Sequence, residues 1–238
     1  MKKNKKVFIL GASSDIGLSV MKIYKKKNYE ILAHYNLGNK KFFEYTEKEN
    51  IKTIKFNFLS SNKKISNFAK RKEFKDYDIL VNASANLKEI SFKNVKIKDI
   101  EDILKVNFYP YLFLMQTIGF EMNKKKWGRI VNLGSIGVKF GGGLKNFPYS
   151  LSKFILEFFP SQTKDWVKNN VLINTIRVGA TKTKLHQKLP SKNLKKRAEL
   201  IPMKRFATTE EIAEFVFFLG SDSNTYISNQ VLSISGGE

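Results

Sequence analysis

The stretch VFILGASSDIG, residues 7–17, decides the fold. Its first four residues form a short apolar run of the kind found in buried strands, and Gly11 then allows the chain to turn sharply. The segment that follows, to Lys27, repeats apolar residues at helical spacing. A strand, a tight glycine loop and a helix in this order form a unit whose helix N-terminus can hold a pyrophosphate. A lone glycine pair is weak evidence, and an ordinary turn is the alternative, so the context along the rest of the chain matters.

The remaining chain alternates apolar runs with helical segments. We expect strands at 30–35, 52–58, 78–82, 129–133, 172–177 and 231–234, and helices near 40–49, 99–122, 149–168 and 210–219, the last capped by Thr208 or Thr209. This alternation predicts an α/β fold with a seven-stranded parallel sheet that is covered on both faces. No repeat or linker marks a boundary, so we expect one domain over 1–238, in which the irregular, lysine-rich stretch 181–205 forms a flap.

Composition narrows the class of protein further. The chain has no cysteine, and its two histidines, His34 and His186, lie far apart, so we expect neither a disulfide framework nor a metal site. We interpret His34 as a strand-end residue and His186 as a flap residue. The longest apolar stretch, 108–120, is shorter than the roughly 18 residues that a membrane span needs. We therefore expect no membrane segment and a cytoplasmic location.

The formal net charge of +22 at pH 7 has two interpretations. Lysines occur along the whole chain beside many Asn, Ile and Phe residues, as an AT-rich genome would produce, and they would then be solvated surface residues. The alternative is a selected electrostatic role toward a polyanion or an acidic partner. Because the basic residues are not confined to one element and no nucleic-acid-binding motif occurs, we expect no specific nucleic-acid partner.

A second chemical motif occupies residues 134–153. Ser135 directly follows a predicted strand, and the carboxyl ends of parallel strands are where ligands bind. Tyr149 and Lys153 are four residues apart, which places them on one face of the predicted helix. A phenol titrates near pH 10, so we expect the neighbouring ammonium group to lower the pKa of Tyr149 toward neutral pH. By itself such a pair is common, and a surface pair on a helix is the alternative.

Further motifs follow in a fixed order: the Asn82-Ala83-Ser84-Ala85 loop, Asn107, GRIVNLGS at 128–135, and a tail from IPMKRFATTEEIAEFVFFLGS at 201–221 to ISGG at 234–237. Together with the glycine loop and the Tyr149/Lys153 pair, they resemble a short-chain dehydrogenase/reductase from end to end. The resemblance implies a three-layer Rossmann fold in which Tyr149 is the general acid/base and Ser135 polarises a substrate carbonyl. It implies that Lys153 binds the nicotinamide ribose and lowers the tyrosine pKa, and that Asn107 completes a proton relay.

The same resemblance implies a bound nicotinamide dinucleotide. At the end of the second predicted strand, where an acidic residue would select NAD, this chain has Tyr35 and Asn36. We therefore expect NADP, with Lys40 nearby, although Ser14 stands where NADP users often have a basic residue and NAD is the alternative. The implied cofactor contacts are Gly11, Ser13, Ser14, Asp15, Ile16, Gly17, Tyr35, Asn36, Asn57, Phe58, Asn82, Ala83, Ser84, Tyr149, Lys153, Gly179, Thr181 and Thr183.

Some residues depart from the family pattern. Ala83 and Ala85 replace an Asn and a Gly, and Val178 replaces a Pro, so cofactor packing is expected to differ slightly. Pro160 falls inside the helix that begins at Tyr149, where it removes an N–H and clashes with the carbonyl of Leu156, which predicts a kink or a break. In relatives this helix packs between subunits. The geometry of the expected homodimer or homotetramer is therefore open.

The function that this resemblance implies is hydride transfer between NADP(H) and a carbonyl or secondary alcohol. The pattern is nearest to 3-oxoacyl-carrier-protein reductases, and an acidic carrier would suit the lysines at 124–126, so a small-molecule or carrier-bound carbonyl substrate is expected. One alternative is a keto-sugar or nucleotide-sugar reductase of surface-glycan synthesis. Another is a cofactor-binding regulator without turnover. The sequence specifies neither the substrate nor the direction of the reaction.

Overall fold

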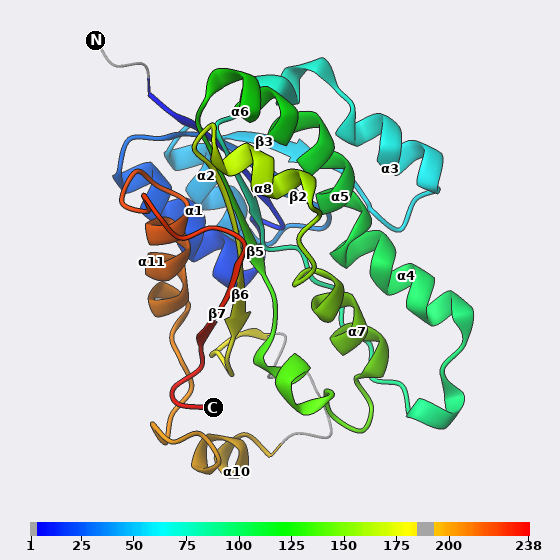
Figure 1. The fold of residues 1–238 in the computed structure, drawn as a ribbon. Coiled ribbons are helices and arrows are strands. Elements are labelled where there is room, and N and C mark those ends of the chain that lie inside the picture. The colour runs from blue at the N-terminus through cyan, green and yellow to red at the C-terminus, as the bar shows by residue number, and fades with distance from the viewer. Residues whose placement is uncertain (1–3, 185–192) are drawn as a thin grey trace.

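A parallel sheet runs through the molecule in the computed structural model, which describes residues 4–184 and 193–238 (Figure 1). Within these residues the sheet has seven strands, in the order β3-β2-β1-β4-β5-β6-β7, and each neighbouring pair is parallel. The strands are β1 (Lys6–Leu10), β2 (Glu30–Tyr35), β3 (Lys52–Lys55), β4 (Ile79–Asn82), β5 (Gly128–Leu133), β6 (Val171–Val178) and β7 (Gln230–Ile234). The predicted α/β Rossmann fold is confirmed. Because the strand order reverses between β1 and β4, the ligand crevice is expected at the loop after β1.

Helices cover both faces of the sheet (Figure 1). On one face lie α1 (Asp15–Lys26), α2 (Lys40–Lys48) and α11 (Thr209–Leu219), and on the other lie α3 (Asn62–Ala69), α4 (Ile97–Asn107), α5 (Tyr109–Leu114), α6 (Phe120–Lys125), α7 (Phe147–Ile155) and α8 (Gln162–Val167). Successive side chains along a strand point to opposite faces of the sheet, so each strand contributes to the hydrophobic core on both faces. In β1, Val7 and Ile9 belong to the core on the α1 side, whereas Phe8 and Leu10 belong to the core on the opposite side.

The helix predicted over 149–168 is broken in two, as Pro160 predicted. Residues 156–161 leave the helical path between α7 and α8. The carbonyl of Leu156, which a continuous helix would have bonded to residue 160, instead accepts a hydrogen bond of 2.5 Å from the Thr175 hydroxyl of β6. Two residues further along β6, Arg177 binds the Glu157 carboxylate through two contacts of 2.7 Å. The break is therefore bonded to the sheet at two points.

Other element boundaries differ from the sequence prediction. The third strand ends at Lys55 rather than Phe58, and the helix predicted over 99–122 is interrupted at Phe108, whose φ of −125° is not helical. Pro110 then lies in the first turn of α5, where its missing N–H costs nothing. Helix α3 was not predicted. Helix α10 (Leu194–Glu199) lies within the proposed flap, whereas residues 185–192 of that flap, His186 included, are outside the described residues.

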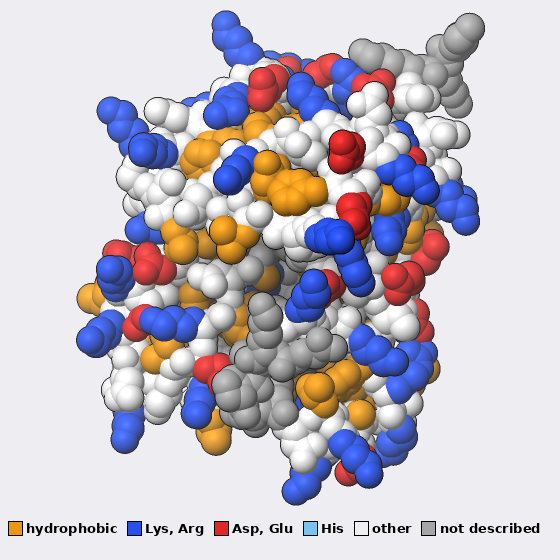
Figure 2. Space-filling view, turned by 180° about the vertical axis from the view of Figure 1, so that it is seen from behind, with side chains coloured by type: hydrophobic (Ala, Val, Ile, Leu, Met, Phe, Trp, Pro, Cys, Tyr) orange, Lys and Arg blue, Asp and Glu red, His pale blue; other side chains and the backbone are white. Residues whose placement is uncertain are grey.

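The surface is basic in many places. Figure 2 shows Lys and Arg side chains spread over one whole face and interleaved with Asp and Glu, rather than gathered into one patch. This distribution agrees with the interpretation of the lysines as solvated surface residues. Within residues 4–184 and 193–238, no helix is both long and apolar enough to cross a bilayer.

Candidate active site

A cavity of about 920 Å³ lies at the carboxyl ends of the central strands. Its walls come from the loops after β1, β4, β5 and β6, together with α7, so residues far apart in sequence meet there. The predicted site residues that line it are Ser13, Ser14, Asp15, Ile16, Ala83, Ser135, Tyr149, Lys153, Gly179, Thr181 and Thr183. The structure thus brings the glycine loop and the Tyr149/Lys153 pair into one cavity.

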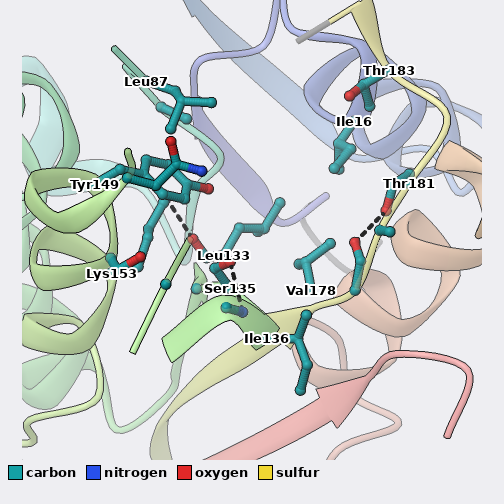
Figure 3. A pocket seen from close by; sticks show the side chains of 18 of the residues that line it. Ile16, Leu87, Leu133, Ser135, Ile136, Tyr149, Lys153, Val178, Thr181 and Thr183 are labelled. Atoms are coloured by element: carbon teal, nitrogen blue, oxygen red, sulfur yellow. Dashed lines mark hydrogen bonds between the residues drawn. The ribbon is translucent and has the colours of Figure 1, made fainter. Parts of the chain in front are cut away.

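The side chains around the cavity fall into three groups (Figure 3). Tyr149 and Lys153 project from α7 on one side, and Thr181 and Thr183 lie on the opposite side beside Ile16 of α1. Ser135 lies between them, directly after β5, where the chain begins a short 3-10 turn (Ile136–Phe140). A ligand that lies along the cavity would contact all three groups.

Lys153 is buried against the backbone. Its ammonium group donates to the carbonyl of Leu133 over 2.8 Å and to the carbonyl of Ser84 over 3.2 Å, and it lies 5.8 Å from the centre of the Tyr149 ring. Burial lowers the pKa of Lys153 to about 7, because the charged form loses its hydration. The two hydrogen bonds to Leu133 and Ser84 fix the position of the lysine in the cavity wall.

The expected lowering of the Tyr149 pKa is wrong for this structure. Burial raises the pKa of Tyr149 to about 12, and a hydrogen bond from Ser135 offsets this only in part. The physical reason is that both members of the pair are desolvated, so the lysine is readily neutralised and its amine is held on two carbonyls. Tyr149 is therefore a protonated donor at neutral pH.

Asn107 lies at the C-terminal end of α4 rather than in the cavity wall. Its side chain accepts from the backbone N–H of Asn86 over 2.6 Å and donates to the carbonyl of the same residue over 3.1 Å. It also donates to the Ser152 hydroxyl over 2.9 Å, and that hydroxyl donates to the carbonyl of Tyr149 over 2.7 Å. Asn107 thus fixes α4, the loop after β4 and α7 relative to one another, and its role in a proton relay stays a prediction.

The glycine loop packs too tightly for side chains at its two glycines. A Cβ added to Gly11, which has a φ of +69°, would lie 2.7 Å from the carbonyl oxygen of Ala83, and one added to Gly17 would lie 2.3 Å from the carbonyl oxygen of Gly11. Ser14 caps α1 by accepting from the N–H of Gly17 over 3.1 Å. The N-terminus of α1 therefore opens into the cavity beside Ser13, with its unpaired N–H groups available to an anion.

The other predicted cofactor residues do not line this cavity. Phe58 is buried with its ring stacked on His34, Tyr35 packs against Phe42, and the Asn57 side chain accepts from the N–H of Leu59. The complete set outside the lining is Gly11, Gly17, Tyr35, Asn36, Asn57, Phe58, Asn82 and Ser84. Their proposed contacts with a dinucleotide stay predictions.

Several lining residues were not predicted from the sequence. Asn39 is the N-cap of α2, and its side-chain amide donates to the carbonyl of Ser13 over 2.9 Å, which links α2 to the glycine loop. An Asn directly before a helical segment is a recognisable cap signal, so this residue could have been found. The apolar members Leu87, Ile136, Phe140, Leu200 and Pro202 carry no such signal, because only the tertiary structure brings them to the cavity.

Comparisons with known proteins find matches along nearly the whole chain. A family model described as enoyl-(acyl carrier protein) reductase matches residues 11–238. The chain is 30% identical to the 3-oxoacyl-[acyl-carrier-protein] reductase FabG of Buchnera aphidicola subsp. Acyrthosiphon pisum, over 97% of this chain and 95% of that protein. It is 29% identical to the same reductase of Buchnera aphidicola subsp. Baizongia pistaciae, over 100% of this chain and 98% of that protein.

Solved structures share the fold across the whole chain. ElxO with NADP bound superposes with a TM-score of 0.83 at 24% identity, covering 99% of this chain and 98% of that one. The 3-oxoacyl (acyl-carrier-protein) reductase of Agrobacterium tumefaciens C58 with NADP bound gives a TM-score of 0.86 at 19% identity, covering 99% and 95%.

Proposed function

The chain belongs to the short-chain dehydrogenase/reductase family, and from this premise we propose that it is an NADPH-dependent reductase of a 3-oxoacyl thioester. The observation that carries the proposal is the meeting of Ser135, Tyr149 and Lys153 in one cavity with the N-terminus of α1. The relatives named above are reductases of carrier-bound 3-oxoacyl groups, and they support this substrate class. The family assignment itself makes the chain an NAD(P)-dependent oxidoreductase.

The cavity fits a dinucleotide. Its volume lies within the range of roughly 300–1,000 Å³ that is usual for ligand sites, and the glycines allow a pyrophosphate to approach the backbone at the start of α1. In this proposal the residues from Ser13 to Ile16 hold the pyrophosphate, Lys153 binds the nicotinamide ribose, and Thr181 and Thr183 lie beside the nicotinamide. The dinucleotide, when bound, supplies the hydride that reduces the carbonyl carbon.

In this mechanism, side chains of the protein donate the proton and stabilise the negative charge that develops on the carbonyl oxygen. The Ser135 hydroxyl donates to the substrate carbonyl oxygen and orients it. Tyr149, which is protonated at neutral pH because its pKa is about 12, transfers its phenolic proton to that oxygen as negative charge develops there. An alkoxide is a stronger base than a phenolate, so this transfer is favourable. Lys153 is held near the Tyr149 ring by the carbonyls of Leu133 and Ser84, and its ammonium form becomes more favourable once a phenolate forms beside it.

The cavity wall favours an acyl chain over a sugar. Leu87, Ile136 and Phe140 contribute apolar surface to the cavity, and Leu200 and Pro202 add more. A keto-sugar would need donors and acceptors for its several hydroxyl groups, because buried polar groups without partners are costly. An apolar wall suits the hydrocarbon of an acyl thioester instead. The sugar reductase is therefore the weaker candidate.

The end of β2 supports NADPH over NADH. No carboxylate occurs among residues 35–43, so nothing in that segment would repel a 2′-phosphate. Asn39 lines the cavity there and Lys40 follows it, with its ammonium group largely exposed. The homo-oligomeric assembly and the cytoplasmic location remain predictions.

The test measures NADPH and NADH oxidation by the purified protein with an acetoacetyl thioester and, in parallel, with keto-sugar nucleotides. We expect thioester-dependent oxidation with NADPH. Tyr149→Phe is expected to bind NADPH as the wild type does while turnover falls by about 10²–10⁴-fold, the usual loss when a general acid is removed. Tyr24→Phe is the matched control, since this buried phenol bonds to Gly220 away from the cavity. Near-normal turnover of Tyr149→Phe would refute the mechanism, and turnover of sugars alone would refute the substrate class.

A further inference from the structure

His34 is a buried histidine outside the cavity whose two ring nitrogens are both bonded. It lies in β2, is 3% exposed, and accepts a hydrogen bond of 3.2 Å from the backbone N–H of Gly11 at Nδ1. Its Nε2 lies 3.0 Å from the carbonyl oxygen of Phe56. A carbonyl only accepts, so Nε2 carries the proton and Nδ1 is the acceptor. The ring is therefore neutral and fixed in one tautomer, in keeping with a pKa that burial lowers to about 4.

The main chain of His34 holds the next residue of the same loop. The N–H of Ala12 donates to the carbonyl of His34 over 2.9 Å. The first two N–H groups after β1 thus both donate to His34: that of Gly11 to its side chain and that of Ala12 to its carbonyl. They are turned away from any ligand, which leaves the later N–H groups of the loop, at the start of α1, to face an anion.

On its other side His34 contacts the chain that follows β3. Its imidazole ring stacks on Phe58, with ring centres 4.4 Å apart and planes 29° apart, and its Nε2–H bonds to Phe56 as described above. Asn57 and Phe58 are among the residues for which a cofactor contact is predicted. His34 therefore connects the loop after β1 with the loop after β3.

We propose that His34 is a positioning residue for the dinucleotide, acting through the Nδ1 acceptor that fixes Gly11 and hence the orientation of the glycine loop. This inference rests on the proposed function, because it needs a dinucleotide to be the ligand. His34 does not touch the reacting atoms. Removal of the His34 imidazole therefore weakens binding of the dinucleotide and does not change the rate of the chemical step.

Two variants separate the acceptor from the rest of the ring. His34→Phe keeps an aromatic ring against Phe58 but removes both nitrogens, and we expect the Kd for NADPH to rise about 5- to 30-fold, as for one or two buried hydrogen bonds, while kcat at saturating NADPH stays within about twofold. His34→Asn retains an acceptor near the position of Nδ1, and we expect its Kd to stay within about threefold of the wild type. The Kd is measured by calorimetry, and kcat and KM by NADPH oxidation.

Phe74→Leu is the matched control, because Phe74 is fully buried in the same aromatic cluster, packs on Phe68 and makes no bond to Gly11. It is expected to lower Tm without changing the Kd. Equal Tm losses in His34→Phe and Phe74→Leu with an unchanged Kd in both would make His34 purely structural and overturn the proposal. So would a Kd for His34→Asn as weak as that of His34→Phe.

Two further outcomes are distinguishable. If His34→Phe does not fold, His34→Gln replaces it, since its amide lies nearer the position of Nε2 and leaves Gly11 without its acceptor. Weaker NADPH binding by His34→Gln than by His34→Asn is then expected, and equal binding by the two overturns the proposal. A wild-type protein that binds neither NADPH nor NADH refutes the proposed function itself, whatever the variants do.

Discussion

Acidification should destabilise the wild-type protein through His34 by an amount that can be worked out from its environment. Burial lowers the pKa of His34 to about 4 in the folded protein, against about 6.5 in the unfolded chain. Between these values the unfolded chain binds the proton and the folded protein does not, so stability falls as pH falls. The contribution of the neutral His34 imidazole to the free energy of unfolding is complete above about pH 6.5, and it is lost progressively as the pH drops toward 4.

The magnitude follows from the difference in pKa. The full shift of about 2.5 units corresponds to roughly 3.4 kcal/mol, and about 2 kcal/mol of this is already lost between pH 7 and pH 5. The assay is urea unfolding at these two pH values, followed by tryptophan fluorescence, for the wild type and for His34→Asn. Carboxylates titrate in both proteins and cancel in the comparison. An equal loss of unfolding free energy in the two proteins would refute the burial of a neutral imidazole at this position.

Three further predictions concern other parts of the molecule. Gly11→Ala forces a Cβ to within 2.7 Å of the Ala83 carbonyl oxygen at a φ of +69°, so we expect a loss of about 2–4 kcal/mol in unfolding free energy and a rise of at least about tenfold in the NADPH Kd, measured by urea unfolding and calorimetry. Thr175→Val leaves the Leu156 carbonyl without its donor at nearly constant volume, and urea unfolding should show a loss of about 1–3 kcal/mol. Asn36→Asp places a carboxylate at the end of β2, and we expect the ratio of kcat/KM for NADPH over NADH to fall by at least about tenfold; an unchanged ratio would show that this position does not select the cofactor.

Features that depend on neighbouring residues in the sequence were predicted well. The glycine loop, the strands and the break at Pro160 follow from steric and hydrogen-bonding rules that act over a few residues. The structure confirms them, except that the third strand ends at Lys55. The spacing of Tyr149 and Lys153 is equally local. The residues on the two sides of the cavity are therefore predictable from local sequence patterns.

Features that depend on distant contacts were not predictable in this way. The pKa of Tyr149 rises rather than falls because burial is set by the whole fold, and a spacing of four residues says nothing about desolvation. The sequence indicates only that His34 lies near the end of a strand. Its bond to Gly11 could not be predicted, because that bond forms only once β2 has paired with β1. The apolar wall around Leu87 and Leu200 joins segments that are more than a hundred residues apart.

The break between α7 and α8 also bears on how a displacement of one helix reaches the other. The short helix that carries Tyr149 and Lys153 is secured at its end by Thr175 and Arg177 of β6, so its placement does not require a continuous helix beyond it. A shift of α8, whose Thr163 and Trp166 side chains are buried, therefore has no continuous helix through which to reach the cavity. Pro160 thus separates the position of the helix that carries Tyr149 and Lys153 from the position of the helix that follows it.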